Sequence, residues 1–195
     1  ANRTRSRCTP GLAVAGPVEL HPARALLEPV VDPVADEALE VPAIGESITR
    51  YVDIGFRIPR LLSHYENEYY MRVTGVDISQ VNVEIAQAMG FEALALDLSI
   101  STLPVIEEPC AVTCYHVVEH STDPLGSITN ISQMMVPGSA LHIEVPIEPG
   151  PPRLRYGHMS EFAHGDLAWM LEFVGLSVIS TVSEDQIERC TALKE

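Results

Sequence analysis

Three aspartates stand at or near the ends of predicted β-strands, where a carboxylate can bind a hydroxyl or an amine. Asp53 lies in an apolar run that leads into Gly55, and a glycine after a strand lets the backbone approach a ligand closely. A carboxylate about twenty residues further on can accept hydrogen bonds from both hydroxyls of a ribose. Asp77 closes a second apolar run 22 positions after Gly55, and Asp97 ends a third. The spacing predicts a nucleotide-type site at the carboxyl edge of a parallel sheet.

A histidine-rich segment follows the fourth predicted strand. The run from His116 to His120, with Glu119 inside it, matches the H-x-x-E-H pattern of inverted zinc proteases. Zinc binding by that pattern needs both histidines on one helical face, but Asp123-Pro124 breaks any helix soon after His120. We therefore expect no metal site and interpret His120, Glu119 and the downstream His158 as candidate general bases, since the pKa of histidine lies near neutrality. For His158, an exposed loop histidine is an equal alternative.

Hydrophobic periodicity predicts the elements that position these residues. Apolar strands that alternate with amphipathic helices indicate an α/β domain, doubly wound around a mostly parallel sheet. The mostly apolar run 91–98 is typical of a central strand covered on both faces. A hairpin at Glu184-Asp185 would join the last two strands. The predicted strands are residues 51–54, 72–76, 91–98, 110–115, 139–147, 177–182 and 187–193, and the predicted helices are residues 58–65, 80–89, 124–135 and 166–173.

Residues 51–183 resemble a class I S-adenosylmethionine-dependent methyltransferase of the small-molecule type. The first motif of that family is an acid followed by alternating glycines, and here it is Asp53-Ile-Gly55-Phe56-Arg57-Ile58-Pro59, with only the first glycine kept. The segment Tyr115–His120 followed by Asp123-Pro124 resembles the region after strand four, and Val136-Pro137-Gly138 resembles the turn before strand five. Several such matches in the right order make this a specific resemblance.

The resemblance implies a Rossmann-like methyltransferase fold with seven strands, S-adenosylmethionine as the cofactor, and methyl transfer to an oxygen or nitrogen of a small molecule. Asp77 matches the acid that holds the ribose, and Asp97 matches the acid that faces the adenine amine. The cofactor-binding residues that it implies are Asp53, Gly55, Asp77, Ile78, Asp97, Leu98, Tyr115 and His116.

Arg57 and Pro59 occupy two positions where the family has glycine, and they leave two hypotheses open. Proline lacks an amide donor and fixes its backbone, so the loop loses freedom to approach a ligand. In the first hypothesis, the modified loop still binds the cofactor. In the second, the domain is catalytically degenerate and serves as a binding or assembly module. The two retained acids, Asp77 and Asp97, favour the first hypothesis.

Composition limits the partners. The net charge of −15 repels phosphate backbones, which argues against nucleic acid. No apolar run approaches the roughly 20 residues that span a bilayer. Four cysteines in 195 residues do not make a disulfide scaffold, so we expect a cytoplasmic protein. The expected partner is a small-molecule acceptor, and a homo-oligomer or a larger assembly stays open.

The chain divides into two predicted parts. Residues 1–45 carry six of the fifteen prolines, which predicts an extended arm. That arm would either close over the cofactor as a lid or lie on the outside of the sheet. Residues 46–195 form the predicted methyltransferase-like domain.

Overall fold

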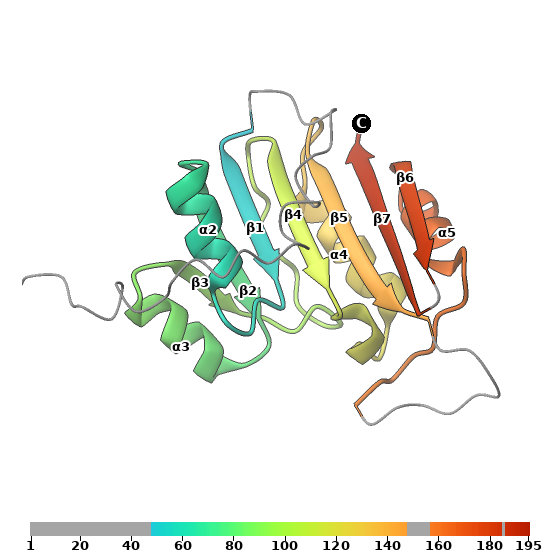
Figure 1. The fold of residues 1–195 in the computed structure, drawn as a ribbon, viewed down its shortest axis with the longest axis horizontal. Coiled ribbons are helices and arrows are strands. Elements are labelled where there is room, and N and C mark those ends of the chain that lie inside the picture. The colour runs from blue at the N-terminus through green and yellow to red at the C-terminus, as the bar shows by residue number, and fades with distance from the viewer. Residues whose placement is uncertain (1–47, 148–156, 185) are drawn as a thin grey trace, which may run out of the picture.

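The computed structural model describes residues 48–147, 157–184 and 186–195, which form the coloured ribbon in Figure 1. The predicted arm, residues 1–45, lies outside the described residues. Among the helices that the structure describes, none combines the length and the apolar character needed to cross a membrane.

In the described part of the chain, seven strands form one sheet in the order β3-β2-β1-β4-β5-β7-β6 (Figure 1). Strands β1 to β5 pair in parallel, whereas β7 is antiparallel to both of its neighbours. The predicted doubly wound, mostly parallel seven-stranded sheet is therefore confirmed. The strands are β1 (Arg50–Ile54), β2 (Arg72–Asp77), β3 (Glu92–Ala95), β4 (Cys110–Tyr115), β5 (Ala140–Pro146), β6 (Leu176–Glu184) and β7 (Ile187–Lys194).

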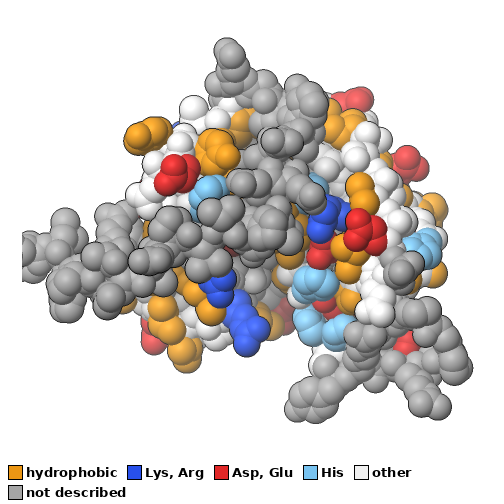
Figure 2. Space-filling model, in the orientation of Figure 1, with side chains coloured by type: hydrophobic (Ala, Val, Ile, Leu, Met, Phe, Trp, Pro, Cys, Tyr) orange, Lys and Arg blue, Asp and Glu red, His pale blue; other side chains and the backbone are white. Residues whose placement is uncertain are grey.

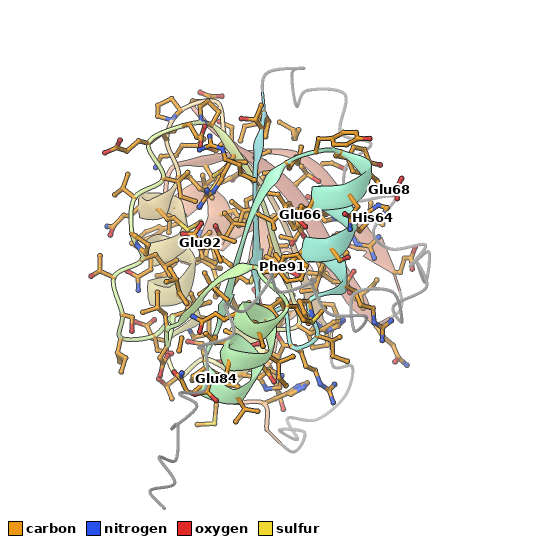
Figure 3. All side chains as sticks on the ribbon, turned by 90° about the vertical axis from the view of Figure 1, so that its left-hand side faces the viewer. His64, Glu66, Glu68, Glu84, Phe91 and Glu92 are labelled. Atoms are coloured by element: carbon orange, nitrogen blue, oxygen red, sulfur yellow. The ribbon has the colours of Figure 1, made fainter. Side chains whose placement is uncertain are left out.

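Helices cover both faces of the sheet, each through an apolar stripe. Leu62 of α2 and Val83 of α3 belong to one buried cluster, and Ile128 of α4 and Leu167 of α5 belong to the other. Figure 3, seen from the β3 edge, shows α2 and α4 on opposite sides of the strands. The helices are α2 (Arg60–Glu68), α3 (Gln80–Ala88), α4 (Pro124–Met134) and α5 (Asp166–Phe173), with the short 3-10 helix η2 (Val118–His120) before α4.

Polar caps fix where two of these helices begin. The Ser79 side chain accepts a hydrogen bond from the Asn82 amide at the start of α3 (3.4 Å). Asp123 accepts one from the Gly126 amide (2.9 Å), with Pro124 as the first residue of α4. Such caps satisfy amide donors that have no partner inside the helix. The break predicted after His120 is thus present, because η2 ends there and a new helix begins at Pro124.

The prediction that residues 91–98 form a central strand is wrong. Strand β3 covers only Glu92–Ala95 and lies at the edge of the sheet, where β2 is its partner. The chain turns away after it, because Asp97 accepts a hydrogen bond from the Ser99 amide (2.8 Å). Leu98 is nevertheless buried in the core, as a loop residue. Its burial explains an apolar run longer than the strand.

The parallel register brings the carboxyl ends of four strands together. Ile54 pairs with Val76 on one side and with Cys114 on the other, and Asp77 pairs with Ala95. The loops that leave β1, β2, β3 and β4 therefore emerge at one edge, as the lower ends of these strands in Figure 1. In open α/β sheets this is the edge at which ligands bind.

Candidate functional site

A cavity of about 450 Å³ opens at the carboxyl edge, between the ends of β1, β2 and β3 and the turn after β4. Its volume is within the range of roughly 300–1,000 Å³ that is common for small-molecule sites. The predicted residues that line it are Gly55, Asp77, Ile78, Asp97, Leu98, His116 and His120.

Gly55 forms the tight turn beneath this cavity. Its φ is +76°, in the left-handed region that glycine adopts at little cost, and its amide donates to the Val76 carbonyl (2.7 Å). A Cβ at this position would lie 2.2 Å from Cγ2 of Val117. Both the backbone conformation and the approach of Val117 therefore require glycine here.

Asp77 accepts hydrogen bonds from three groups of the chain. The Ser79 amide donates to Oδ1 (2.8 Å), and the Arg57 amide (3.0 Å) and the Asn82 side-chain amide (3.3 Å) donate to Oδ2. A carboxylate has about four acceptor positions, so these donors fill most of them. The fixed carboxylate is 7% exposed and lines the cavity. Its contact with Asn82 is the longest of the three and the easiest to exchange for a ligand.

A second carboxylate and two apolar side chains complete the β3 side of the cavity. The Leu96 amide donates to the Asp77 carbonyl (3.0 Å), which brings Asp97 beside the end of β2. Ile78 is 70% exposed although it is a large apolar residue, and Leu98 lies across the same cavity. An exposed apolar side chain on a cavity wall is a natural contact for a flat ring.

His116 is held by two acids on the β4 side. Its Nε2 lies 2.9 Å from Oε1 of Glu144, and its Nδ1 lies 3.5 Å from Oε1 of Glu119. Hydrogen bonds to Glu119 and Glu144 raise the pKa of His116 to about 9, against the lowering effect of burial. Burial alone would raise the pKa of Glu144, but hydrogen bonds from His116 and from Arg189 Nε (2.7 Å) lower it overall. His116 is therefore a cation at neutral pH and no base.

The three predicted catalytic residues come together beside the cavity, and His120 is the one that lines it. The Met159 amide (2.7 Å) and the Ser160 amide (3.1 Å) donate to the Glu119 carbonyl, which ties the segment after residue 156 to η2. Nδ1 of His120 contacts the Gly157 carbonyl (2.7 Å), and the rings of His120 and His158 meet edge to face with centroids 5.0 Å apart. Figure 2 shows histidine side chains gathered on this face.

Two predicted cofactor residues lie elsewhere. Asp53 and Tyr115 line a second hollow of about 290 Å³, which shares Gly55 and Arg57 with the cavity. Asp53 is 3% exposed and accepts a hydrogen bond from Thr113 (3.0 Å). Burial raises the pKa of Asp53 to about 7, and the hydrogen bond from Thr113 offsets this only in part. The turn at Gly55 thus separates these two residues from the cavity that holds Asp77.

The paired histidines of the zinc-protease pattern do not share a helical face. His116 has a φ of +52° and contacts Glu144, whereas His120 contacts the Gly157 carbonyl and His158. The 3-10 helix between them spans three residues. The expectation that no long helix carries this motif is confirmed.

Sequence reasoning missed four residues that hold the site in place. Ser79 and Asn82 bind Asp77, and Glu144 and Arg189 fix His116 from strands β5 and β7. Two signals were present in the sequence. A serine directly before a helical segment is a typical N-cap, and a glutamate inside an otherwise apolar strand is unusual enough to indicate a buried ion pair.

Comparison with known proteins gives an independent result. A model of the family described as "Methyltransferase domain" matches residues 23–181 of this chain. No curated protein matches the sequence.

Many solved structures share the fold. The cyclase SpnF aligns with a TM-score of 0.70 at 15% identity, over 84% of this chain and 80% of that chain. A 1,6-didemethyltoxoflavin-N1-methyltransferase from Burkholderia thailandensis, solved with 1,6-didemethyltoxoflavin and S-adenosylhomocysteine, gives 0.61 at 20% identity, over 84% and 81%. A SAM-dependent methyltransferase from Aquifex aeolicus gives 0.62 at 16% identity, over 83% and 89%. At these identities the likeness establishes the fold alone.

Proposed function

This chain belongs to the methyltransferase domain family, whose cofactor is S-adenosylmethionine, and we propose that it transfers a methyl group to an oxygen or nitrogen of a small molecule. The observation that carries this proposal is the pair of acids at adjacent strand ends, Asp77 and Asp97, which open onto one cavity with Gly55 at its floor.

The residues of the cavity fit the nucleoside half of the cofactor. Asp77 would accept the ribose hydroxyls, with Asn82 giving up its long contact to the carboxylate. Asp97 would accept from the adenine amine, and Ile78 and Leu98 would cover the two faces of the ring. The hollow of Asp53 and Tyr115 begins on the far side of the Gly55 turn, where the amino-acid half of a long ligand could continue.

The bound cofactor supplies a methyl group that is already activated by a positively charged sulfur. The chain therefore has to align the acceptor with that methyl group and keep water out, which in favourable models lowers a barrier by roughly 7–11 kcal/mol. His116 adds a fixed positive charge beside the cavity, held by Glu119 and Glu144.

An acceptor hydroxyl or amine must also lose a proton, and His120 is the group at the cavity that we assign to accept it. Because the Gly157 carbonyl can only accept a hydrogen bond, Nδ1 of His120 carries the proton and Nε2 carries the lone pair. Glu119 lies 3.8 Å from Nε2, where its carboxylate would stabilise the positive charge that His120 gains with the proton, and His158 packs against the edge of the ring.

Methyl transfer from radiolabelled S-adenosylmethionine to pools of phenols, carboxylic acids and amines tests this proposal. We expect labelled ethers, esters or N-methyl products, and a loss of about 10²–10⁴-fold in turnover for His120→Ala, the usual contribution of a general base. Label found on carbon, or turnover that His120→Ala leaves unchanged, would contradict the assignment.

The hydrogen bonds to Asp77 favour a second candidate, a domain that keeps the fold and binds no cofactor. The Arg57 and Ser79 amides occupy acceptor positions on both carboxylate oxygens. If Asn82 does not move, only about one position is left for two ribose hydroxyls. Cofactor binding decides between the two candidates.

A further inference from the structure

Glu119, His120 and His158 place three ligand atoms within 4.8 Å of one another. The residues come from two segments, η2 and the start of the 157–184 range, and backbone hydrogen bonds from Met159 and Ser160 to the Glu119 carbonyl hold the segments together. Backbone hydrogen bonds therefore hold together the two segments that carry these three side chains.

Glu119 is a buried carboxylate that His116 compensates only in part, with Nδ1 3.5 Å from Oε1. Its side chain is 1% exposed, and its Oε2 has no hydrogen-bond partner within the part of the chain that the structure describes. A buried carboxylate without full compensation is costly, and a bound cation is one of the ways in which proteins remove that cost. A cation bound between the Glu119 carboxylate and the two imidazoles would remove that cost.

Nε2 of His120 is also oriented as a metal ligand is. The Nδ1 proton of His120 goes to the Gly157 carbonyl, so Nε2 presents its lone pair toward Glu119 Oε1 at 3.8 Å. Around a tetrahedral ion with bonds of ~2.1 Å, ligand atoms lie about 3.4 Å apart, which is close to the 3.8 Å between Nε2 of His120 and Oε1 of Glu119. His116 Nδ1, 3.5 Å from Glu119, would donate to the carboxylate from outside, as groups behind metal ligands commonly do.

We propose that Glu119, His120 and His158 bind a divalent transition-metal ion. Two imidazoles and one carboxylate form a donor set that suits Zn²⁺, Fe²⁺, Co²⁺ or Ni²⁺ better than Mg²⁺ or Ca²⁺. Three protein ligands leave a position of the ion open, which is the arrangement of catalytic rather than structural sites. This set differs from the H-x-x-E-H pair, because His158 takes the place of His116.

The ion would act on the acceptor, and this part of the inference rests on the proposed methyl transfer. An acceptor hydroxyl that takes the open position forms a bond from its oxygen to the ion, and its pKa falls, so that it loses its proton to water. In the loaded protein water would thus take the proton in place of His120, and His120 would serve as a ligand. The substrate class becomes hydroxyl compounds that can bind a metal.

Calorimetric titration of Zn²⁺ into the chelator-treated full chain tests the site. We expect one ion per chain, with affinity at least tenfold weaker in Glu119→Gln and in His158→Ala. His164→Ala is the matched control, because His164 is a half-exposed histidine near Glu188 and outside the cluster. This variant should bind Zn²⁺ with the affinity of the wild type. An equal loss in the control, no loss in the cluster variants, or no binding would overturn the proposal.

Two further measurements identify the ligands of the ion and separate the metal site from the methyl transfer. The visible spectrum of the Co²⁺-loaded protein should show nitrogen and oxygen ligation, whereas a thiolate charge-transfer band would assign the ion to cysteine and reject the site. Titration of S-adenosylhomocysteine into the same variants separates the two proposals. Nucleoside binding without Zn²⁺ binding rejects the metal site alone, and Zn²⁺ binding without nucleoside binding rejects the methyl transfer alone. Circular dichroism of each variant shows that it is folded.

Discussion

At the scale of single residues, Gly55 meets two constraints at once. Its φ of +76° carries a strain of roughly 1–2 kcal/mol for any residue with a side chain. Its missing Cβ also leaves space for Val117, and overfilling a packed site costs about 1–3 kcal/mol more. We therefore predict that Gly55→Ala lowers the free energy of unfolding by about 2–5 kcal/mol, as measured by urea denaturation.

Gly90 offers a matched control for this prediction. Its φ is +94°, and a Cβ there meets no atom within 4 Å. Gly90→Ala should therefore carry the backbone strain alone and lower the free energy of unfolding by only about 1–2 kcal/mol. Equal losses in the two variants would show that the contact with Val117 adds nothing.

Asp53 makes the stability depend on pH. Its pKa is about 7 in the folded chain, because burial penalises its charged form, and about 3.9 when unfolded. Between these values the folded state binds more protons, so the free energy of unfolding falls as pH rises from about 4 to 7 and stays low above. The ionisable groups coupled to Asp53 are Asp77, which adds to the shift, and Tyr51, Cys114 and Tyr115, whose pKa values burial raises.

Asp53→Asn should remove this dependence. At pH 8 the variant avoids the buried charge and should be more stable than the wild type, by at most about 4 kcal/mol, since each unit of pKa corresponds to ~1.4 kcal/mol. At pH 5 the difference should fall to about 1.5 kcal/mol, because the folded carboxyl keeps its proton there and only the unfolded carboxyl has lost it. Urea denaturation at both pH values measures this, and a variant that is less stable at pH 8 would contradict the assigned pKa.

At the scale of elements, an ion pair joins the two strands that meet behind His116. Glu144 of β5 lies opposite Arg189 of β7 in the register, and both side chains are mostly buried. Breaking a buried pair costs up to about 3–5 kcal/mol, and the His116 imidazolium beside Glu144 would offset part of that cost here. We predict a loss of that order for Arg189→Met and a smaller loss for the double variant with Glu144→Gln.

A double-mutant cycle measures this coupling. The single variants should sum to a larger loss of unfolding free energy than the double variant shows, by at least about 1 kcal/mol. Additive losses would mean that Arg189 supports Glu144 no better than solvent does. His116 would then be held by Glu119 and Glu144 without help from β7.

Some elements could be predicted from the sequence and others could not. Strands β1, β2, β4 and β5 are apolar runs bounded by turns, and periodicity placed them within a residue or two of their observed ends. Strand β3 was predicted too long, because the apolar residues Leu96 and Leu98 belong to the loop that follows it. Both line the cavity, and Leu98 is also buried in the core. Apolar character reports burial, and it does not distinguish a buried strand from a buried loop.

At the scale of the whole molecule, the order of the motifs along the chain predicted the fold and placed Asp77 and Asp97 at one edge. The order did not reveal the hydrogen bonds that hold them. Arg57 has a positive φ and its amide donates to Asp77, and the docking of residues 157–160 on η2 depends on backbone donors. Contacts made by backbone amides do not depend on residue type, so the sequence does not reveal them. Asp53 and Tyr115, close to the cavity in sequence, likewise face another hollow because the Gly55 turn intervenes.

In the proposed function, Asp77 and Asp97 bind the nucleoside of S-adenosylmethionine in spite of the modified turn. Calorimetric titration of S-adenosylmethionine and S-adenosylhomocysteine tests it most directly, with Asp77→Asn as the variant and Glu84→Gln, on the outer face of α3 (Figure 3), as the control. We predict that each chain binds one cofactor and that Glu84→Gln leaves the affinity unchanged. In Asp77→Asn the affinity should be at least tenfold weaker, because the loss of a charged hydrogen bond costs about 1.5–3 kcal/mol. The absence of binding heat at millimolar cofactor, with no rise in the unfolding temperature, would contradict cofactor binding by Asp77 and Asp97. The chain would then be a methyltransferase fold that binds no cofactor.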